Sequence, residues 1–174
     1  MSITLILGGA RSGKSAYAER LATESGLPVT YIATAQVYDD EFGARIKHHQ
    51  VRRPAEWKTV EVPHRLARTV KAEATEGRCL IIDCLTLWLA QCICPECTPP
   101  EGIKWEQEKL ALIDVLPKLP GQIVIVSNEV GMGIVPLGEI NRQFQDEQGR
   151  LNQAIAKLCD QVMFIAAGLP LKLK

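Results

Sequence analysis

The stretch that most constrains this chain is Gly8–Ser15, with the sequence GGARSGKS, which fits the pattern G-x-x-x-x-G-K-[ST]. An apolar run, Ile3–Leu7, precedes it, and a helical pattern follows that Gly26 is placed to end. Glycines allow backbone N–H groups to turn towards an anion, and the helix N-terminus adds partial positive charge. A chance glycine-rich turn is the alternative, but strand, loop and helix are in register, so the pattern predicts a nucleotide-binding P-loop.

Each part of this loop has a predicted role towards a nucleoside triphosphate, ATP or GTP. Lys14 is placed to reach the β- and γ-phosphates, and the Ser15 hydroxyl to join the shell of Mg²⁺. A second metal ligand is expected at the end of a neighbouring buried strand, where Asp83 closes Cys79–Asp83. The alternative is that Asp83 caps the following helix. The predicted nucleotide contacts in the loop are Gly8, Gly9, Ala10, Arg11, Ser12, Gly13, Lys14 and Ser15.

Strand patterns alternate with helix patterns along the whole chain, which predicts an α/β fold with a mostly parallel sheet covered by helices on both faces. No linker or repeat divides it, so we expect a single domain over 1–174. Strands are predicted at 3–7, 29–33, 57–62, 79–83, 122–126, 162–166 and in the final LKLK. Helices are predicted after the P-loop and at 39–51, 64–75, 86–93, 105–116 and 138–158. The packed side of the last helix is expected to carry Ile140, Phe144, Leu151, Ile155 and Leu158.

Charge and composition exclude several classes of protein. Lys+Arg and Asp+Glu both number 20, and a sequence-independent nucleic-acid binder would need an excess of cations. No apolar run is long enough to span a bilayer, and the features of a secretory signal are missing. We therefore expect a cytoplasmic protein without a nucleic-acid partner or membrane span, whose six cysteines stay reduced.

A further segment, SNEVGMGIVP, follows the predicted strand 122–126. The carboxyl ends of strands in an open α/β sheet carry the ligand site, so Asn128, Glu129, Gly131 and Gly133 are expected near the nucleotide. A plain glycine-rich turn is the alternative. The Asn-Lys-x-Asp motif with which signalling GTPases read guanine does not occur.

Two adjacent histidines, His48 and His49, lie in the predicted helix 39–51 and precede Arg52 and Arg53. A neutral imidazole can attack phosphorus, and guanidinium groups can neutralise phosphate oxygens. His49 follows Phe42 by seven residues and Ile46 by three, which puts it on their helix face. A solvated helix surface is the alternative.

The blocks GGARSGKS, YIATAQ, RIKHHQVRRP, SNEVGMGIVP and GRLNQAIA together resemble the bifunctional adenosylcobinamide kinase/adenosylcobinamide-phosphate guanylyltransferase family of cobalamin biosynthesis. The resemblance runs essentially from end to end. It implies a recombinase-like P-loop NTPase fold, a homotrimer, and adenosylcobinamide and its phosphate as substrates. It also implies two reactions, a phosphorylation by ATP or GTP and a transfer of GMP from GTP through a guanylylated histidine.

The resemblance also assigns residues. The guanylylated histidine corresponds to His49. Nucleotide contacts outside the P-loop correspond to Ala33, Thr34, Ala35, Gln50, Val51, Arg52, Arg53, Glu61 and Asp83. Some relatives carry glutamate in place of Asp83.

Cys92, Cys94 and Cys97, in CICPEC, depart from the family pattern. Three thiols are one ligand short of a structural zinc site, so ordinary reduced cysteines are favoured. Two other functions stay open: a small-molecule P-loop kinase without a covalent histidine, and a P-loop regulatory module that binds ATP.

Overall fold

The computed structural model describes residues 1–36, 53–94 and 101–174. The predicted helix 39–51 lies wholly outside the described residues. So do His48, His49, Gln50, Val51, Arg52 and Cys97.

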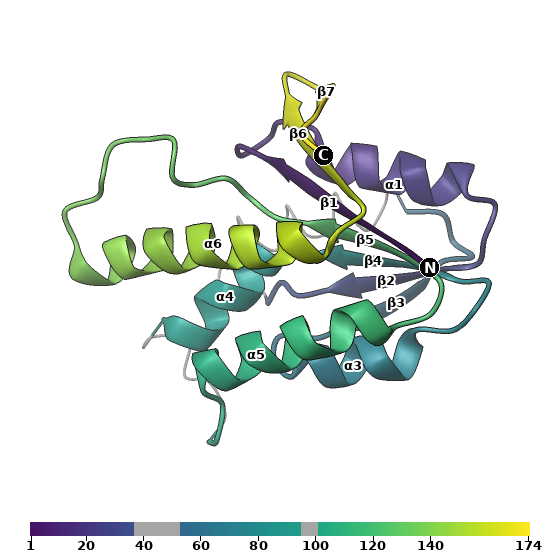
Figure 1. The fold of residues 1–174 in the computed structure, drawn as a ribbon, viewed down its shortest axis with the longest axis horizontal. Helices are drawn as coiled ribbons and strands as arrows, with labels where there is room; N and C mark the ends of the chain where they lie inside the picture. Colours follow the sequence, from purple (N-terminus) through teal and green to yellow (C-terminus); the bar gives the residue numbers. More distant parts are fainter. Residues whose placement is uncertain (37–52, 95–100) are drawn as a thin grey trace.

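The centre of the molecule is a seven-stranded sheet in the order β3-β2-β4-β5-β1-β6-β7 (Figure 1). Every neighbouring pair is parallel except β6 and β7, which are antiparallel. The α/β fold with a mostly parallel sheet is thus confirmed. The strands are β1 Ser2–Gly8, β2 Val29–Ala33, β3 Lys58–Glu61, β4 Cys79–Asp83, β5 Gln122–Val126, β6 Gln161–Ala166 and β7 Leu169–Lys172.

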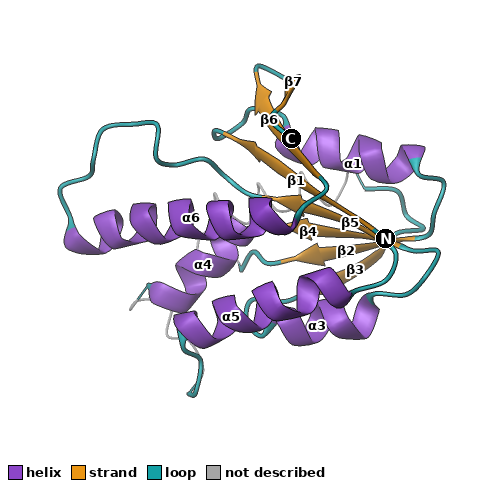
Figure 2. Cartoon of the chain, in the orientation of Figure 1, coloured by secondary structure: helices purple, strands orange, loops and turns teal. Residues whose placement is uncertain are grey.

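Helices cover both faces of this sheet (Figure 2). Helix α1 packs with its buried Ala18 and Ala22 on one face, against residues such as Ile81 of β4. The remaining helices pack on the other face around Trp88 and Leu151. No helix in the described ranges is long and apolar enough to cross a membrane. The helices are α1 Lys14–Glu24, α3 Leu66–Glu73, α4 Leu85–Ile93, α5 Trp105–Val115 and α6 Glu139–Leu158, with a short 3-10 turn at Leu116–Lys118.

The strands and helices lie within a few residues of their predicted bounds, but the packed side of α6 differs. Ile140, expected on that side, is 39% exposed, because the first turns of α6 extend past the strands (Figure 1). The buried residues of α6 begin at its middle. Leu151 and Ile155 share this buried surface with three polar side chains: Glu147, Gln148 and Asn152.

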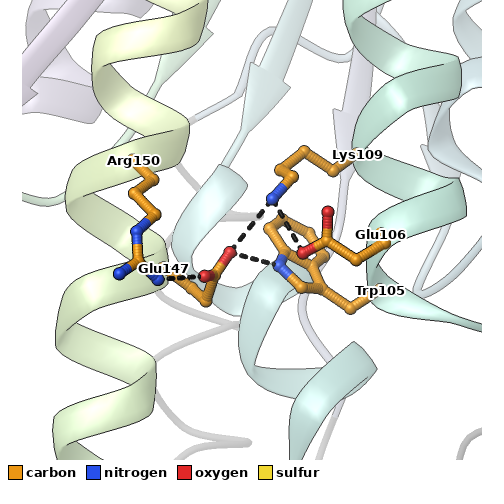
Figure 3. A network of polar contacts seen from close by, with 5 residues as sticks. All are labelled: Trp105, Glu106, Lys109, Glu147 and Arg150. Carbon is orange, nitrogen blue, oxygen red and sulfur yellow. Dashed lines mark hydrogen bonds and ion pairs between the residues drawn. The ribbon is translucent and has the colours of Figure 1, made fainter.

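Glu147 links α6 to α5 (Figure 3). Its carboxylate accepts hydrogen bonds from Trp105 Nε1 at 2.7 Å and Lys109 Nζ at 3.1 Å, and it pairs with Arg150. Burial acts to raise the pKa of Glu147, but the hydrogen bonds from Trp105, Arg150 and Lys109 outweigh it and hold the pKa below its usual value. The two helices are therefore joined by a satisfied, charged contact.

Gly121 and Gly77, both outside the P-loop, differ in how closely other backbone atoms pack against them. Gly121 and Gly77 both have positive φ, 85° and 71°. A Cβ at Gly121 would lie 2.6 Å from the carbonyl oxygens of Thr75 and Arg78, whereas a Cβ at Gly77 meets nothing within 4 Å. We expect Gly77→Ala to cost about 1 kcal/mol from backbone strain alone. Gly121→Ala should cost clearly more, because backbone must move as well. Urea unfolding measures both, and equal losses would contradict this account of the packing.

Candidate active site

The P-loop joins β1 to α1, and close packing explains two of its glycines. A Cβ on Gly8 would lie 2.4 Å from the carbonyl oxygen of Ile165, and one on Gly13, with φ of 102°, would lie 3.2 Å from Cα of Gly168. The N–H of Gly168 also donates to the carbonyl of Ser12 at 2.8 Å. The turn between β6 and β7 therefore supports the loop from outside.

Helix α1 begins at Lys14, within this loop, with Gly13 as its N-cap. No side chain caps it, and its first turn holds no acidic residue. No residue of this first turn therefore neutralises the partial positive charge of the helix end, which suits an anionic ligand.

Lys14 is the buried cation of the P-loop. The residue is 7% exposed, and its Nζ donates a hydrogen bond to the carbonyl of Gly9. Burial lowers the pKa of Lys14, while Cys84 and Asp83 nearby act to raise it. A cation this buried is held at a cost in desolvation free energy, which phosphate oxygens would offset.

Asp83 ends β4, and its partner is a tyrosine. The Tyr31 hydroxyl donates to Asp83 Oδ2 at 2.5 Å. Burial, followed by the negative charge of Asp83, raises the pKa of Tyr31 well above its usual value, so the hydroxyl stays a donor. Cys84, one residue past Asp83, is the N-cap of α4. The alternative in which Asp83 caps the helix is therefore wrong.

Strand β5 lies between the P-loop strand and the Asp83 strand, with Val126 level with Ile6 on one side and Asp83 on the other. Beyond β5, the N–H of Glu129 donates to the carbonyl of Gly8 at 3.0 Å, and the N–H of Asn128 to Thr86 Oγ1 at 2.8 Å. Segment 127–129 thus bridges the P-loop and the start of α4.

The four residues predicted in this segment therefore divide into two pairs. Asn128 and Glu129 lie at the P-loop edge, as the topology predicted. Gly131 and Gly133 are exposed on the loop that leaves this edge.

The residues Ala33, Thr34 and Ala35 follow β2 at the same edge. Ala33 pairs with Asp83 on β4 and with Glu61 on β3, which places the three side by side along the carboxyl ends. Thr34 is fully buried, and its Oγ1 donates to the carbonyl of Cys84 and accepts the N–H of Cys84, at 2.7 and 2.8 Å. Its side chain therefore ties two strand ends together.

Arg53 contacts Tyr31 of β2. Its guanidinium carbon lies 3.6 Å from the centre of the Tyr31 ring, a cation–π contact. It also borders a hollow of about 400 Å³ whose other lining residues are Pro54, Ala55, Trp57, Thr59 and Glu61. Of the predicted residues in 48–53, Arg53 is the one within the described ranges.

The sequence analysis did not identify Tyr31 as a site residue. It also did not identify Gln148 and Asn152, which hydrogen bond to Ser127 and to the carbonyl of Asn128 just after β5. A signal did exist for the last two. They are polar residues four positions apart that flank Leu151 on an apolar helix face.

The described residues contain no group of three or more His, Cys, Asp or Glu side chains arranged to hold a metal. In the CICPEC segment, Cys92 is buried and Cys94 half-buried. Burial, with a smaller contribution from Glu108, raises the pKa of Cys92 to about 12. A neutral thiol is a poor zinc ligand and fits an ordinary reduced cysteine.

Comparison with known proteins decides the family. Residues 4–173 match the family described as cobinamide kinase / cobinamide phosphate guanyltransferase. The chain belongs to this family.

Similar proteins agree with this assignment. The chain is 57% identical over 170 residues to the bifunctional adenosylcobalamin biosynthesis protein CobP of Pseudomonas aeruginosa, covering 98% of this chain and 96% of that one. It is 36% identical over 179 residues to CobU of Escherichia coli, covering 98% of both.

Among solved structures, the ATPase EscN of the enteropathogenic E. coli type III secretion system is similar, with a TM-score of 0.57 at 11% identity. The match covers 94% of this chain and 41% of the EscN chain, less than half of its length. This likeness concerns the fold alone and agrees with a P-loop α/β fold.

Lys14→Met tests the site's electrostatics. Because the folded-state pKa of Lys14 is lowered, its charge opposes folding below the unfolded value of about 10.4. The variant should therefore melt no lower than wild type at pH 7.5. Wild type should gain several degrees in Tm with GTP and Mg²⁺, and the variant should gain almost none, because the main phosphate partner is gone. An equal GTP-induced shift in both proteins would contradict this assignment.

Proposed function

We propose that this chain catalyses two successive reactions at the carboxyl edge of its sheet. In the first, ATP or GTP phosphorylates the hydroxyl of adenosylcobinamide. In the second, GTP gives GMP to the product through His49, yielding adenosylcobinamide-GDP and pyrophosphate. The observation that carries the proposal is the P-loop with Lys14 beside Asp83, in a chain of the cobinamide kinase / cobinamide phosphate guanyltransferase family.

In the phosphoryl transfer, the residues of the chain would position the phosphates of the nucleotide and neutralise their charge. The N–H groups of Gly8–Ser15 and the Nζ of Lys14 would hold the β- and γ-phosphates against the uncapped end of α1. Charge that develops on the transferred group is stabilised most where donors are already in place. Lys14, fixed by its bond to Gly9, is such a donor.

Ser15 and Asp83 fit the part of a Mg²⁺ site that a P-loop supplies. Among the described residues, Tyr31 bonds Oδ2 of Asp83, and Oδ1 could accept a metal-bound water or the ion. Mg²⁺ keeps several waters and phosphate oxygens, so one hydroxyl and one carboxylate are enough protein ligands. The ion, when bound, would neutralise the phosphate oxygens.

In the second reaction, the lone pair of a neutral His49 nitrogen attacks the α-phosphorus of GTP, and the bond to pyrophosphate breaks. A phosphate oxygen of the acceptor then attacks the same phosphorus, and the phosphorus–nitrogen bond breaks. Arg52 and Arg53 follow in the sequence and suit the phosphate charge. The stacking of Arg53 on Tyr31, which itself binds Asp83, supports a role at this edge.

The remaining nucleotide contacts in this proposal are Ala33, Thr34, Ala35, Gln50, Val51 and Glu61. A kinase without a covalent histidine is the second candidate, and it would use the same Lys14 and Asp83. A regulatory module is disfavoured by membership of an enzyme family. The cytoplasmic location stays a prediction.

The role of His49 separates the two enzyme candidates. We expect His49→Ala to accept no label from GTP labelled at the α-phosphate, while it still phosphorylates adenosylcobinamide from a γ-phosphate. The nucleophile is needed only where GMP is carried on the protein. The adduct on wild type should be acid-labile and base-stable, as a phosphorus–nitrogen bond to imidazole is.

His48→Ala is the matched control, since on a helix its side chain would leave about 100° from that of His49. It should still form the adduct. Label on His49→Ala but not on His48→Ala would overturn the assignment, and no label on wild type would favour the plain kinase.

We also propose a homotrimer, and exposed apolar side chains on the loop between β5 and α6 support self-association. Ile134 is 96% exposed and Leu137 98%, with Met132 at 78% and Val135 at 64%. Patches of this kind mark contact surfaces. Wild type should sediment as a trimer, and Ile134→Asp/Leu137→Asp as a monomer, because burying two carboxylates is unfavourable. A monomeric wild type would refute the trimer.

A further inference from the structure

A buried polar network lies beneath the carboxyl end of β5. Ser127 and Gln148 are fully buried and Asn152 is 4% exposed. Ser127 Oγ donates to Asn152 Oδ1 at 2.7 Å, and Gln148 Nε2 donates to both of these oxygens at 2.9 Å. Two of the three side chains thus come from one face of α6, four residues apart.

This network holds one particular backbone position. Asn152 Nδ2 donates to the carbonyl of Asn128 at 3.0 Å, while the N–H of Asn128 donates to Thr86 Oγ1 at 2.8 Å. The next N–H, of Glu129, is bound to the carbonyl of Gly8 in the P-loop. The backbone of Asn128 is therefore fixed from α6, from α4 and, one residue on, from the phosphate-binding loop.

The side chain of Asn128 is left to bind something else. Among the described residues, the hydrogen bonds of Asn128 are made by its backbone N–H and carbonyl and not by its side-chain amide. The residue is half-buried. It lies at the end of β5, between the strand that leads into the P-loop and the strand that ends at Asp83. An amide donor at this place can bond a phosphate oxygen without adding charge to a site that already contains Lys14.

Stability alone does not account for this arrangement. Apolar side chains of similar size at 148 and 152 would avoid the cost of desolvating amides, but they would leave the carbonyl of Asn128 without its bond from Asn152. The Oε1 of Gln148 is moreover buried without a hydrogen-bond partner among the described residues. The network therefore includes an unfavourable buried amide oxygen while it fixes the position of Asn128.

We propose that Asn128 contacts the phosphoryl group being transferred, and that Gln148 and Asn152 are positioning residues that act through Asn128. The proposal rests on the proposed function, because it requires the nucleotide phosphates to lie in the P-loop. Loss of the Asn128 amide, or of its support, should slow transfer more than it weakens nucleotide binding.

A double-mutant cycle on the kinase reaction tests this. Asn128→Ala should lower kcat at least about tenfold, with little change in Tm or in KM for the nucleotide. Asn152→Ala should lower kcat by a similar factor and also lower Tm. The double variant should be no slower than Asn128→Ala alone, since both changes remove the same contact. Gln148→Met, close in shape, serves as a second positioning variant if Asn152→Ala folds poorly.

Glu147→Gln is the matched control. Glu147 is the neighbour of Gln148 and is also buried, but it hydrogen bonds to Trp105 of α5 and not to Ser127 (Figure 3). It should lower Tm but leave kcat near wild type.

Three results would overturn the inference alone: unchanged kcat in Asn128→Ala, multiplicative losses in the double variant, or an equal loss of kcat in Glu147→Gln. A wild-type chain with neither activity would overturn the proposed function, and this inference with it.

Discussion

The parallel alignment of β1, β5 and β4 is the constraint on which the rest of the site depends. Because all three strands point the same way, the P-loop, segment 127–129 and Asp83 emerge at one edge. Strand β2 adds Ala33 and β3 adds Glu61 at the same level. Gly8 and Asp83, which are 75 positions apart in the sequence, lie at the same edge of the sheet for this reason.

Electrostatics at this edge favour an anion before any ligand arrives. A buried Lys14, an uncapped helix end and the guanidinium of Arg53 supply positive charge or its equivalent. The carboxylate of Asp83 supplies negative charge at the same edge, and the Tyr31 hydroxyl donates a hydrogen bond to one of its oxygens. Such an arrangement suits a phosphate chain together with a cation, and it suits both transfer reactions equally well.

Much of this could be predicted from sequence, because the decisive signals are local. GGARSGKS after an apolar run defines the P-loop, and CLIID defines the strand that carries Asp83. The bond from Tyr31 to Asp83 could not be predicted, since it depends on β2 lying next to β4. The exposure of Ile140 depends likewise on where the sheet ends beneath α6. The roles of His49 and Arg52 were inferred from helical phase, from their neighbours in the sequence and from resemblance, and they remain predictions because both residues lie outside the described ranges.

The central claim is that one P-loop site serves both reactions, and Asp83→Asn tests it most directly. The change keeps the size of the side chain and removes the charge that would face the metal. One preparation should be assayed for phosphorylation of adenosylcobinamide and for protein-bound GMP formed from GTP. The account predicts that both rates fall by at least about tenfold. Loss of phosphorylation with normal formation of the GMP adduct would contradict it and would require two separate nucleotide sites.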